Sequence, residues 1–342
     1  MQQYDIVVIG GGPAGLAAAI SAREHYEGKI LILERENQLG GTLNQCIHNG
    51  FGKNIFSEDL TGPEFIQKFI DKVNKLNISY KLNTTVLNLS NTKEINAVNA
   101  YDGIFKIQAK AIILATGCRE RPRGFLNLPG SRCAGIYTVG SAQKFINLEG
   151  YMPGKQIVIL GTGDIALIMA SRLALEGANV KAVVESKDFI DAADKKLGGF
   201  LNDFNIPLRI KHKVTAIQGE SRIEGITLVK LDNNNEVIKA SEEYISCDSL
   251  LLSVDLYPDN ELAKQAKILI NSSTGQIELK ENSQTNIEGV FACGTVVSGY
   301  AFSENVVKQS YNIGINTSQY IKKFSTLACL FFLFMHITVS LF

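Results

Sequence analysis

One strand–glycine turn–helix–strand unit occurs twice in this chain, and this repeat constrains the fold more than any other feature. The first copy occupies residues 4–34 and ends in Glu34, and the second occupies residues 157–185 and ends in Glu185. In both copies the first glycine precedes the acid by 24 residues. One glycine motif alone is a weak signal, whereas two copies with the same spacing predict two nucleotide-binding units.

The first glycine cluster has the residues that a dinucleotide pyrophosphate requires. Gly10 permits a tight turn, and Gly12 lets the backbone approach a pyrophosphate at the start of the helix. Gly15 permits close packing of the helix on the sheet, and an acid at the end of the second strand accepts hydrogen bonds from an adenosine ribose. The predicted binding residues of this copy are Gly10, Gly12, Pro13, Ala14, Gly15 and Glu34.

The second cluster repeats this pattern with alanine in place of the last glycine. An acid at the ribose also disfavours a 2′-phosphate, so this copy is predicted to prefer NADH to NADPH. Its predicted binding residues are Gly161, Gly163, Asp164, Ala166 and Glu185.

The rest of the pattern completes an α/β fold with two Rossmann-like domains. Residues 112–114 and 250–252 are apolar segments typical of buried parallel strands, and residues 61–64 have the pattern of a helix start. A length of 342 residues suggests about two domains.

Composition excludes several other classes. The 34 basic and 34 acidic residues cancel, so no nucleic-acid partner is indicated. The six cysteines are scattered and the four histidines have no ligand spacing, so neither a disulfide framework nor a metal site is expected. An apolar run near the N-terminus already forms the first predicted strand, so we expect a cytoplasmic protein without a secretory signal peptide.

With these motifs the chain resembles the flavoproteins of the pyridine nucleotide-disulfide oxidoreductase superfamily, which includes thioredoxin reductase, glutathione reductase and NADH oxidases. Three further segments carry the resemblance, at residues 40–42, 115–117 and 285–295. The resemblance implies FAD in the first domain. The further residues that it places at FAD are Gly40, Gly41, Thr42, Ala115, Thr116, Gly117, Gly294 and Thr295.

The resemblance also implies the domain order. An FAD-binding domain is expected at residues 1–120 and 256–324, with an NAD-binding domain inserted at residues 121–255. This is the thioredoxin-reductase-like arrangement, without a separate dimerisation domain. A homodimer stays open. The apolar tail at residues 325–342 is either a short membrane anchor or an extension without a selected role.

Four segments resemble a narrower group, the NAD/FAD-dependent oxidoreductases associated with anaerobic glycerol-3-phosphate dehydrogenase. These segments are residues 43–52, 118–124, 129–131 and 149–155. That group in turn resembles the small FAD subunits of opine oxidases and hydrogen cyanide synthase. The resemblance implies hydride transfer between NADH and FAD, with electrons exchanged with a partner flavoprotein dehydrogenase.

Two alternatives to this function stay open. The first is an NADH oxidase or diaphorase that uses oxygen. The second is a non-catalytic paralogue, because Thr295 stands where the family has Asp or Asn, and Asp255 stands where it has Gly.

Three further features each have two interpretations. Cys46 is either a lone redox thiol beside the flavin, which would make it catalytic, or a small packing residue. His48 either reaches the flavin edge or lies in a surface loop. The arginines at 119, 121 and 123 either contact a pyrophosphate or partner, or are solvated.

Overall fold

In the computed structural model the chain divides into two compact units. Unit 1 comprises residues 1–119 and 257–342, and unit 2 comprises residues 120–256. The structure describes residues 1–299 and 304–339, with side chains throughout those ranges except at residues 195 and 324–339. Each unit contains a parallel sheet with helices packed against it, so the α/β class predicted from the sequence is confirmed.

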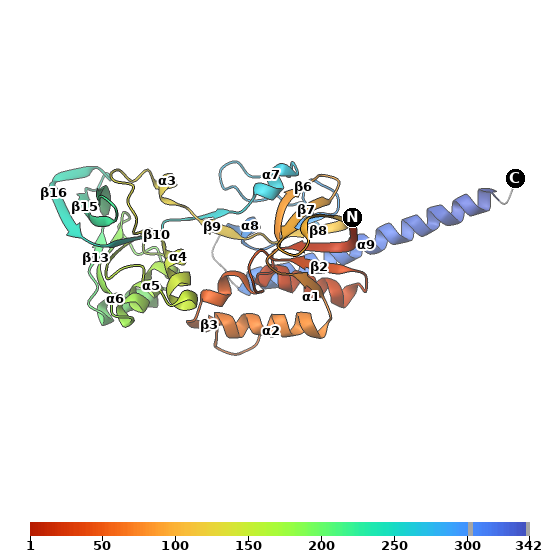
Figure 1. Ribbon diagram of the computed structural model, residues 1–342, viewed down its shortest axis with the longest axis horizontal. Helices are drawn as coiled ribbons and strands as arrows, with labels where there is room; N and C mark the ends of the chain where they lie inside the picture. Colours follow the sequence, from red (N-terminus) through yellow and green to blue (C-terminus); the bar gives the residue numbers. More distant parts are fainter. Residues whose placement is uncertain (300–303, 340–342) are drawn as a thin grey trace. The chain divides into compact units, whose positions relative to one another are not determined.

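Unit 1 is built on a seven-stranded sheet (Figure 1). Its strands in spatial order are β5 (Ser79–Lys81), β2 (Ile30–Leu33), β1 (Gln2–Ile9), β8 (Gly103–Leu114), β7 (Glu94–Asn99) and β6 (Thr85–Leu89), with β19 (Val290–Ala292) also paired to β8. Strands β5, β2, β1, β8 and β19 are parallel, whereas β7 and β6 extend the sheet in antiparallel fashion. The parallel strands are therefore the ones that share a carboxyl edge.

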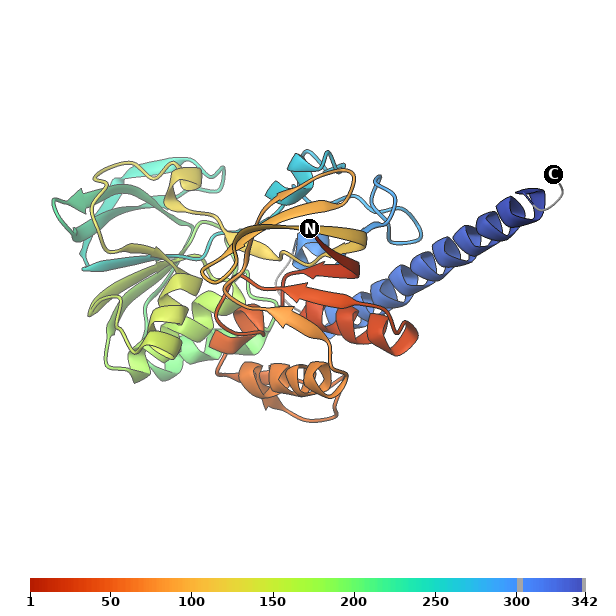
Figure 2. The same cartoon turned by 45° about the vertical axis from the view of Figure 1, so that its right-hand side comes forward.

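Three helices cover one face of this sheet, α1 (Pro13–His25), α2 (Gly62–Lys75) and α9 (Glu304–Val339). Helix α2 begins at a capping box, in which Thr61 and Glu64 satisfy each other's backbone N–H groups. Helices α1 and α9 lie side by side (Figures 1 and 2). Their close approach requires glycine at Gly314, because a methyl group there would lie 2.3 Å from the carbonyl oxygen of Ala18.

The remaining short elements of unit 1 lie in its loops. They are η1 (Gly41–Gln45), β3 (Asn49–Phe51), β4 (Leu60–Thr61), α7 (Glu261–Gln265) and α8 (Thr295–Ser298). Strands β3 and β4 form a small antiparallel pair. A second apolar core, on the face opposite the three helices, includes residues of β6, β7 and α7.

Unit 2 has a five-stranded parallel sheet with the order β10 (Ile136–Thr138), β17 (Ser249–Leu252), β11 (Gln156–Leu160), β12 (Asn179–Glu185) and β13 (Leu208–Ile210). A three-stranded antiparallel sheet of β14 (His212–Gly219), β15 (Ile223–Leu231) and β16 (Val237–Ser246) packs on one face. The helical elements are α3 (Arg123–Leu126), α4 (Val139–Lys144), η2 (Phe145–Glu149), α5 (Asp164–Leu175), η3 (Lys195–Gly198) and α6 (Gly199–Asp203). Of these, α4, α5 and α6 contribute to the core on the other face.

Two strands carry the chain from one unit to the other. They are β9 (Cys118–Glu120) and β18 (Leu256–Pro258), which pair with each other.

The backbone of the C-terminal tail is helical as far as Val339. The tail's side chains from residue 325, and residues 340–342 altogether, lie outside the described residues, and so do the two interpretations of the tail. Among the helices as described, none combines the length and the apolar content that a membrane span needs.

Candidate dinucleotide sites

The glycine turn of unit 1, at residues 10–15, packs closely against the carboxyl end of β8. Gly10 has a φ of +109°, and a methyl group on it would lie 2.3 Å from the carbonyl oxygen of Ala115. A methyl group on Gly15 would lie 1.9 Å from the carbonyl oxygen of Gly10. Both positions therefore require glycine for the chain's own packing.

Gly12 differs, because its free side is open. The nearest atom to a methyl group there would be the Cα of Gly41, at 3.9 Å. Gly12 is the N-cap of α1, and among the described residues no side chain caps this helix and no acid lies in its first turn. The first N–H groups of α1 are thus left for a ligand with negative charge.

Two other predicted segments meet this turn. Gly40 donates its N–H to the carbonyl oxygen of Gly11 at 2.8 Å. A methyl group on Gly294 would lie 2.8 Å from the Cβ of Ala14, which places the return segment against the start of α1. Thr42 is exposed at the start of η1.

Residues 115–117 complete the same edge. Thr116 donates its hydroxyl to the carbonyl oxygen of Asp259 at 2.7 Å. A methyl group on Gly117 would lie 3.7 Å from the Oγ1 of Thr295, and Cys118 donates its thiol to the Thr295 carbonyl at 3.0 Å. The structure therefore brings the predicted FAD residues together where β1, β8 and β19 end.

Glu34 lies at the end of β2 and is 6% exposed. Its carboxylate accepts the N–H of Gly11 at 2.6 Å and the N–H of Glu36 at 2.9 Å. An ionised carboxylate has about four acceptor sites, so Glu34 can still accept from a ribose hydroxyl. An open glycine, an uncapped helix start and a buried acid fit the adenosine diphosphate portion of FAD.

Unit 2 repeats this arrangement at the start of α5. Gly161 has a φ of +106°, and a methyl group on it would lie 1.9 Å from the carbonyl oxygen of Ser253. A methyl group on Gly163, the N-cap of α5, would meet no atom within 4 Å. Ala166, at the position of Gly15, is fully buried, so the helix here approaches the sheet with room for one methyl group.

The acids of unit 2 are held by backbone amides. Glu185 is 6% exposed and accepts the N–H of Thr162 at 3.2 Å and the N–H of Lys187 at 3.0 Å. Asp164, in the first turn of α5, accepts the N–H of Ala193 at 2.7 Å. Its charge is therefore directed at the loop after β12. These residues fit the pyrophosphate and ribose of a nicotinamide nucleotide.

Thr162 is the residue of this turn whose side-chain contacts the sequence reasoning missed. Its hydroxyl donates to Glu185 at 2.6 Å and accepts the N–H of Asp191 at 2.9 Å. The only sequence signal was a hydroxyl residue between the two glycines, where the first copy has Gly11.

Three of the cysteines that the structure describes differ in burial. Cys46 is half-buried against the core of unit 1 and donates its thiol to the carbonyl oxygen of Thr42 at 3.4 Å. Cys247 and Cys293 are buried, and burial raises the pKa of each thiol to about 12. A thiol with so high a pKa is a poor nucleophile, so these two residues serve packing.

His48 and the arginine cluster have contacts within the chain. The ring of His48 packs against Phe51, with centroids 5.2 Å apart. Arg119 pairs with Glu261, and Arg121 pairs with Asp255 at 3.0 Å. The guanidinium of Arg123 donates to backbone carbonyls between residues 128 and 131. The three arginines thus have partners within the chain, and their contact with a pyrophosphate or a partner stays a prediction.

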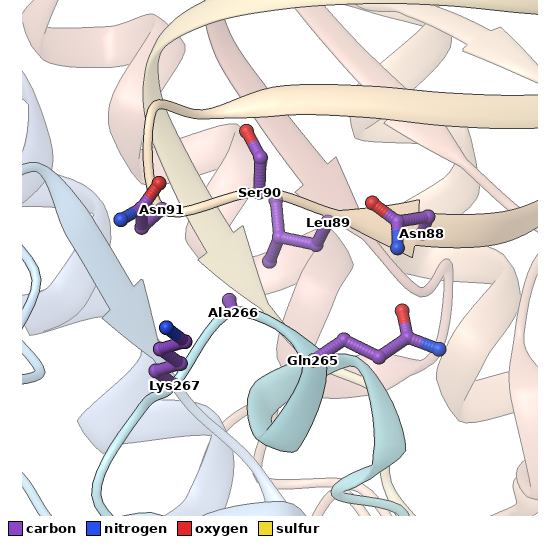
Figure 3. A pocket seen from close by; sticks show the side chains of 7 residues that line it. All are labelled: Asn88, Leu89, Ser90, Asn91, Gln265, Ala266 and Lys267. Atoms are coloured by element: carbon purple, nitrogen blue, oxygen red, sulfur yellow. The ribbon is translucent and has the colours of Figure 1, made fainter.

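One surface hollow lies apart from the glycine turns (Figure 3). It is lined by the end of β6 with the turn after it, and by residues 265–267 at the end of α7 and just after it. Its lining contains amide and hydroxyl groups and one ammonium, and we assign no ligand to it. Among the described residues no cluster of His, Cys, Asp or Glu could hold a metal ion.

Comparison with known proteins gives consistent matches over most of the chain. The family model described as pyridine nucleotide-disulphide oxidoreductase matches residues 4–312. A "34.2 kDa protein in rubredoxin operon" of Clostridium pasteurianum is 31% identical over 304 residues, which cover 87% of this chain and 90% of that protein. Hydrogen cyanide synthase subunit HcnB of Pseudomonas protegens is 25% identical over 300 residues, which cover 81% of this chain and 62% of that protein.

Among solved structures, thioredoxin reductase of T. acidophilum matches with a TM-score of 0.74 at 20% identity, and the match covers 95% of this chain and 100% of that chain. At this identity the match concerns the fold alone. It confirms the predicted thioredoxin-reductase-like fold with two Rossmann-type domains.

Proposed function

Because the chain belongs to the pyridine nucleotide-disulphide oxidoreductase family, whose members are flavin-dependent NAD(P)H oxidoreductases, we propose that unit 1 binds FAD and unit 2 binds NADH. Hydride transfer between nicotinamide and flavin is the chemistry that the two cofactors supply when bound. The chain exchanges the electrons with a second acceptor or donor.

The observation that carries this proposal is the equivalence of the two turns. Gly12 and Gly163 each cap a helix and have an open side, and Glu34 and Glu185 each accept the N–H of the second residue of the turn. The chain's role is to fix each pyrophosphate on a helix start and each ribose on an acid. Positioning of the two reacting rings, and exclusion of water from them, supply the rate enhancement, because hydride transfer needs no acid or base of unusual pKa.

The preference for NADH rests on Glu185. Its buried carboxylate would lie against the 2′-position of the adenosine ribose, where a 2′-phosphate would bring negative charge next to negative charge. A hydroxyl there donates a hydrogen bond instead. We therefore expect NADH to bind more tightly than NADPH.

A partner flavoprotein dehydrogenase is the proposed electron donor or acceptor. Two similar proteins support a multicomponent system by their names, one from a rubredoxin operon and one a subunit of hydrogen cyanide synthase. The resemblance of residues 43–52 and 149–155 to proteins associated with glycerol-3-phosphate dehydrogenase makes a dehydrogenase of that type the first partner to test.

Anaerobic titration of the purified protein with NADH, and separately with NADPH, tests the proposal. We expect the flavin absorbance to bleach at low NADH concentration and only at much higher NADPH concentration. A protein that binds no FAD, or whose flavin ignores both nucleotides, would overturn the proposal and favour the non-catalytic paralogue.

Oxygen consumption separates the partner-dependent function from the oxidase alternative. With NADH alone in air, a partner-dependent enzyme should consume oxygen slowly, and an added dehydrogenase with its substrate should change the redox state of the flavin. Fast, steady oxygen uptake without any partner would support an NADH oxidase instead.

A further inference from the structure

The second glycine turn differs from the first at its middle residue. Thr162 occupies the position of Gly11 and is fully buried. In unit 1 the acid Glu34 receives just the backbone N–H from this position, at 2.6 Å, because Gly11 has no side chain. In unit 2 the acid Glu185 receives both the N–H of Thr162, at 3.2 Å, and its hydroxyl, at 2.6 Å.

The single proton of this hydroxyl fixes the direction of the contacts around it. An ionised carboxylate only accepts hydrogen bonds, so the hydroxyl must donate its proton to Glu185. Its oxygen is then an acceptor for the N–H of Asp191, at 2.9 Å. Thr162 therefore bridges the acid and the loop that follows β12.

The same loop is tied to the turn a second time. Asp164 accepts the N–H groups of Ala193 and Asp194, at 2.7 and 3.3 Å. Within the loop, the ammonium of Lys187 lies 2.7 Å from the carboxylate of Asp191. Lys187 is the cation nearest to Glu185 in the sequence. The hydrogen bond from Asp191 to Thr162 therefore also fixes the position of the aspartate that pairs with this lysine.

We propose that Thr162 is a positioning residue for the selectivity between NADH and NADPH. This inference rests on the proposed NADH site in unit 2. Its hydroxyl holds the Glu185 carboxylate toward the ribose and keeps Lys187 paired with Asp191. Without the hydroxyl, the carboxylate loses a charge-assisted hydrogen bond and the loop loses an anchor. Lys187 then becomes available to a 2′-phosphate, so selectivity falls together with NADH affinity.

A purely structural role makes a different prediction. If Thr162 only filled a buried position, its replacement would weaken the binding of NADH and NADPH by the same factor. The ratio of the two dissociation constants is therefore the decisive measurement.

The experiment compares Thr162→Val with Thr162→Ser in the purified FAD-loaded protein, by equilibrium binding of NADH and of NADPH. Valine keeps the volume and removes the hydroxyl, whereas serine keeps the hydroxyl. We expect Thr162→Val to raise the Kd for NADH roughly tenfold, since a hydrogen bond to a charged group is lost, and to raise the Kd for NADPH less. Thr162→Ser should keep both constants close to those of the unchanged protein.

A second readout needs no nucleotide. The backbone N–H of Asp191 should exchange with solvent faster in Thr162→Val than in Thr162→Ser. Ser171→Ala is the matched control, because Ser171 lies on α5 and, among the described residues, its hydroxyl bonds only to the carbonyl of Ile168 in the same helix. That control should change neither the selectivity nor the exchange at Asp191.

Thr162→Gly provides a second test should the valine variant fold poorly, since it copies the residue that unit 1 has at this position. An equal loss of affinity for both nucleotides, or unchanged selectivity and exchange, would overturn the inference while leaving the NADH site intact. An unchanged protein that binds neither nucleotide would instead overturn the proposed function.

Discussion

The backbone N–H of Gly40 donates a hydrogen bond to the carbonyl oxygen of Gly11 at 2.8 Å, which joins two glycine segments of unit 1. The next residue, Gly41, approaches so closely that a methyl group on it would lie 3.1 Å from the Cα of Gly12. A methyl group on Gly12 itself would still have room. The chain's own packing therefore does not require glycine at Gly12, whereas the proposed FAD pyrophosphate would.

The first prediction follows from this difference between packing and ligand. Gly12→Ala should reduce FAD affinity roughly tenfold or more, because its methyl group would occupy space that the pyrophosphate needs. Gly163→Ala should do the same to NADH binding. Each variant should lose about 1 kcal/mol of stability or less, as expected when alanine replaces glycine at an N-cap. Flavin content and NADH affinity, measured on each variant, check the prediction.

Gly124→Ala is the matched control, because a methyl group there, as at Gly163, meets no atom within 4 Å. It should leave both cofactors bound. Loss of FAD in Gly163→Ala with retained NADH binding would contradict the assignment of the two turns.

The second prediction concerns the pH dependence of stability at Glu120. Its carboxylate accepts the N–H of Gly140, and burial raises the pKa of this carboxyl above its ordinary value of 4.5. The folded protein therefore holds a proton that the unfolded chain has already lost. Stability from this group is greatest below pH 4.5 and falls as the pH rises through the raised pKa.

Thermal midpoints of the unchanged protein and of Glu120→Gln, measured between pH 4 and 8, test this sign. The unchanged protein should lose stability relative to the variant as the pH rises. Glu64→Gln should show the opposite trend, because the N–H of Thr61 lowers the pKa of Glu64. A Glu120 difference that stays constant with pH would contradict the assignment.

Much of this fold could be predicted because the patterns that specify it lie within short stretches of the sequence. The turns at Gly10 and Gly161, the helix start at Thr61 and the short apolar strands each depend on neighbours within a few residues. The places of Glu34 and Glu185 could be predicted for a related reason. A parallel strand that follows a helix ends at the same edge of the sheet as the strand before that helix.

The unpredicted contacts join residues that are distant in sequence. The hydroxyl of Thr162 finds Asp191 only when the loop after β12 folds back over the turn. The pairs of Arg119 with Glu261 and of Arg121 with Asp255 form only when the folded chain brings these residues together. The sequence offers no periodicity for such pairs, so only the folded chain reveals them.

The third prediction addresses Cys46. Its thiol donates to the carbonyl oxygen of Thr42, and its own carbonyl accepts the N–H of Gly62 at 2.8 Å. Serine can donate the same hydrogen bond, so Cys46→Ser should keep NADH-dependent flavin reduction within about twofold of the original rate. If Cys46 is a redox thiol, the variant should lose peroxide reduction. Stopped-flow absorbance without and with peroxide distinguishes the packing role from the redox role.

The fourth prediction compares equivalent positions of the two helices, Gly15 in α1 and Ala166 in α5. A methyl group on Gly15 would lie 1.9 Å from the carbonyl oxygen of Gly10, so Gly15→Ala must displace backbone and should cost about 1–3 kcal/mol of stability or more. Ala166 already has its methyl group buried, and Ala166→Gly should cost about 1 kcal/mol from helix propensity alone. Urea unfolding of both variants measures the two losses. If Gly15→Ala were as stable as the unchanged protein, α1 would not pack against its turn as closely as described. That result would also count against an FAD pyrophosphate site at Gly12.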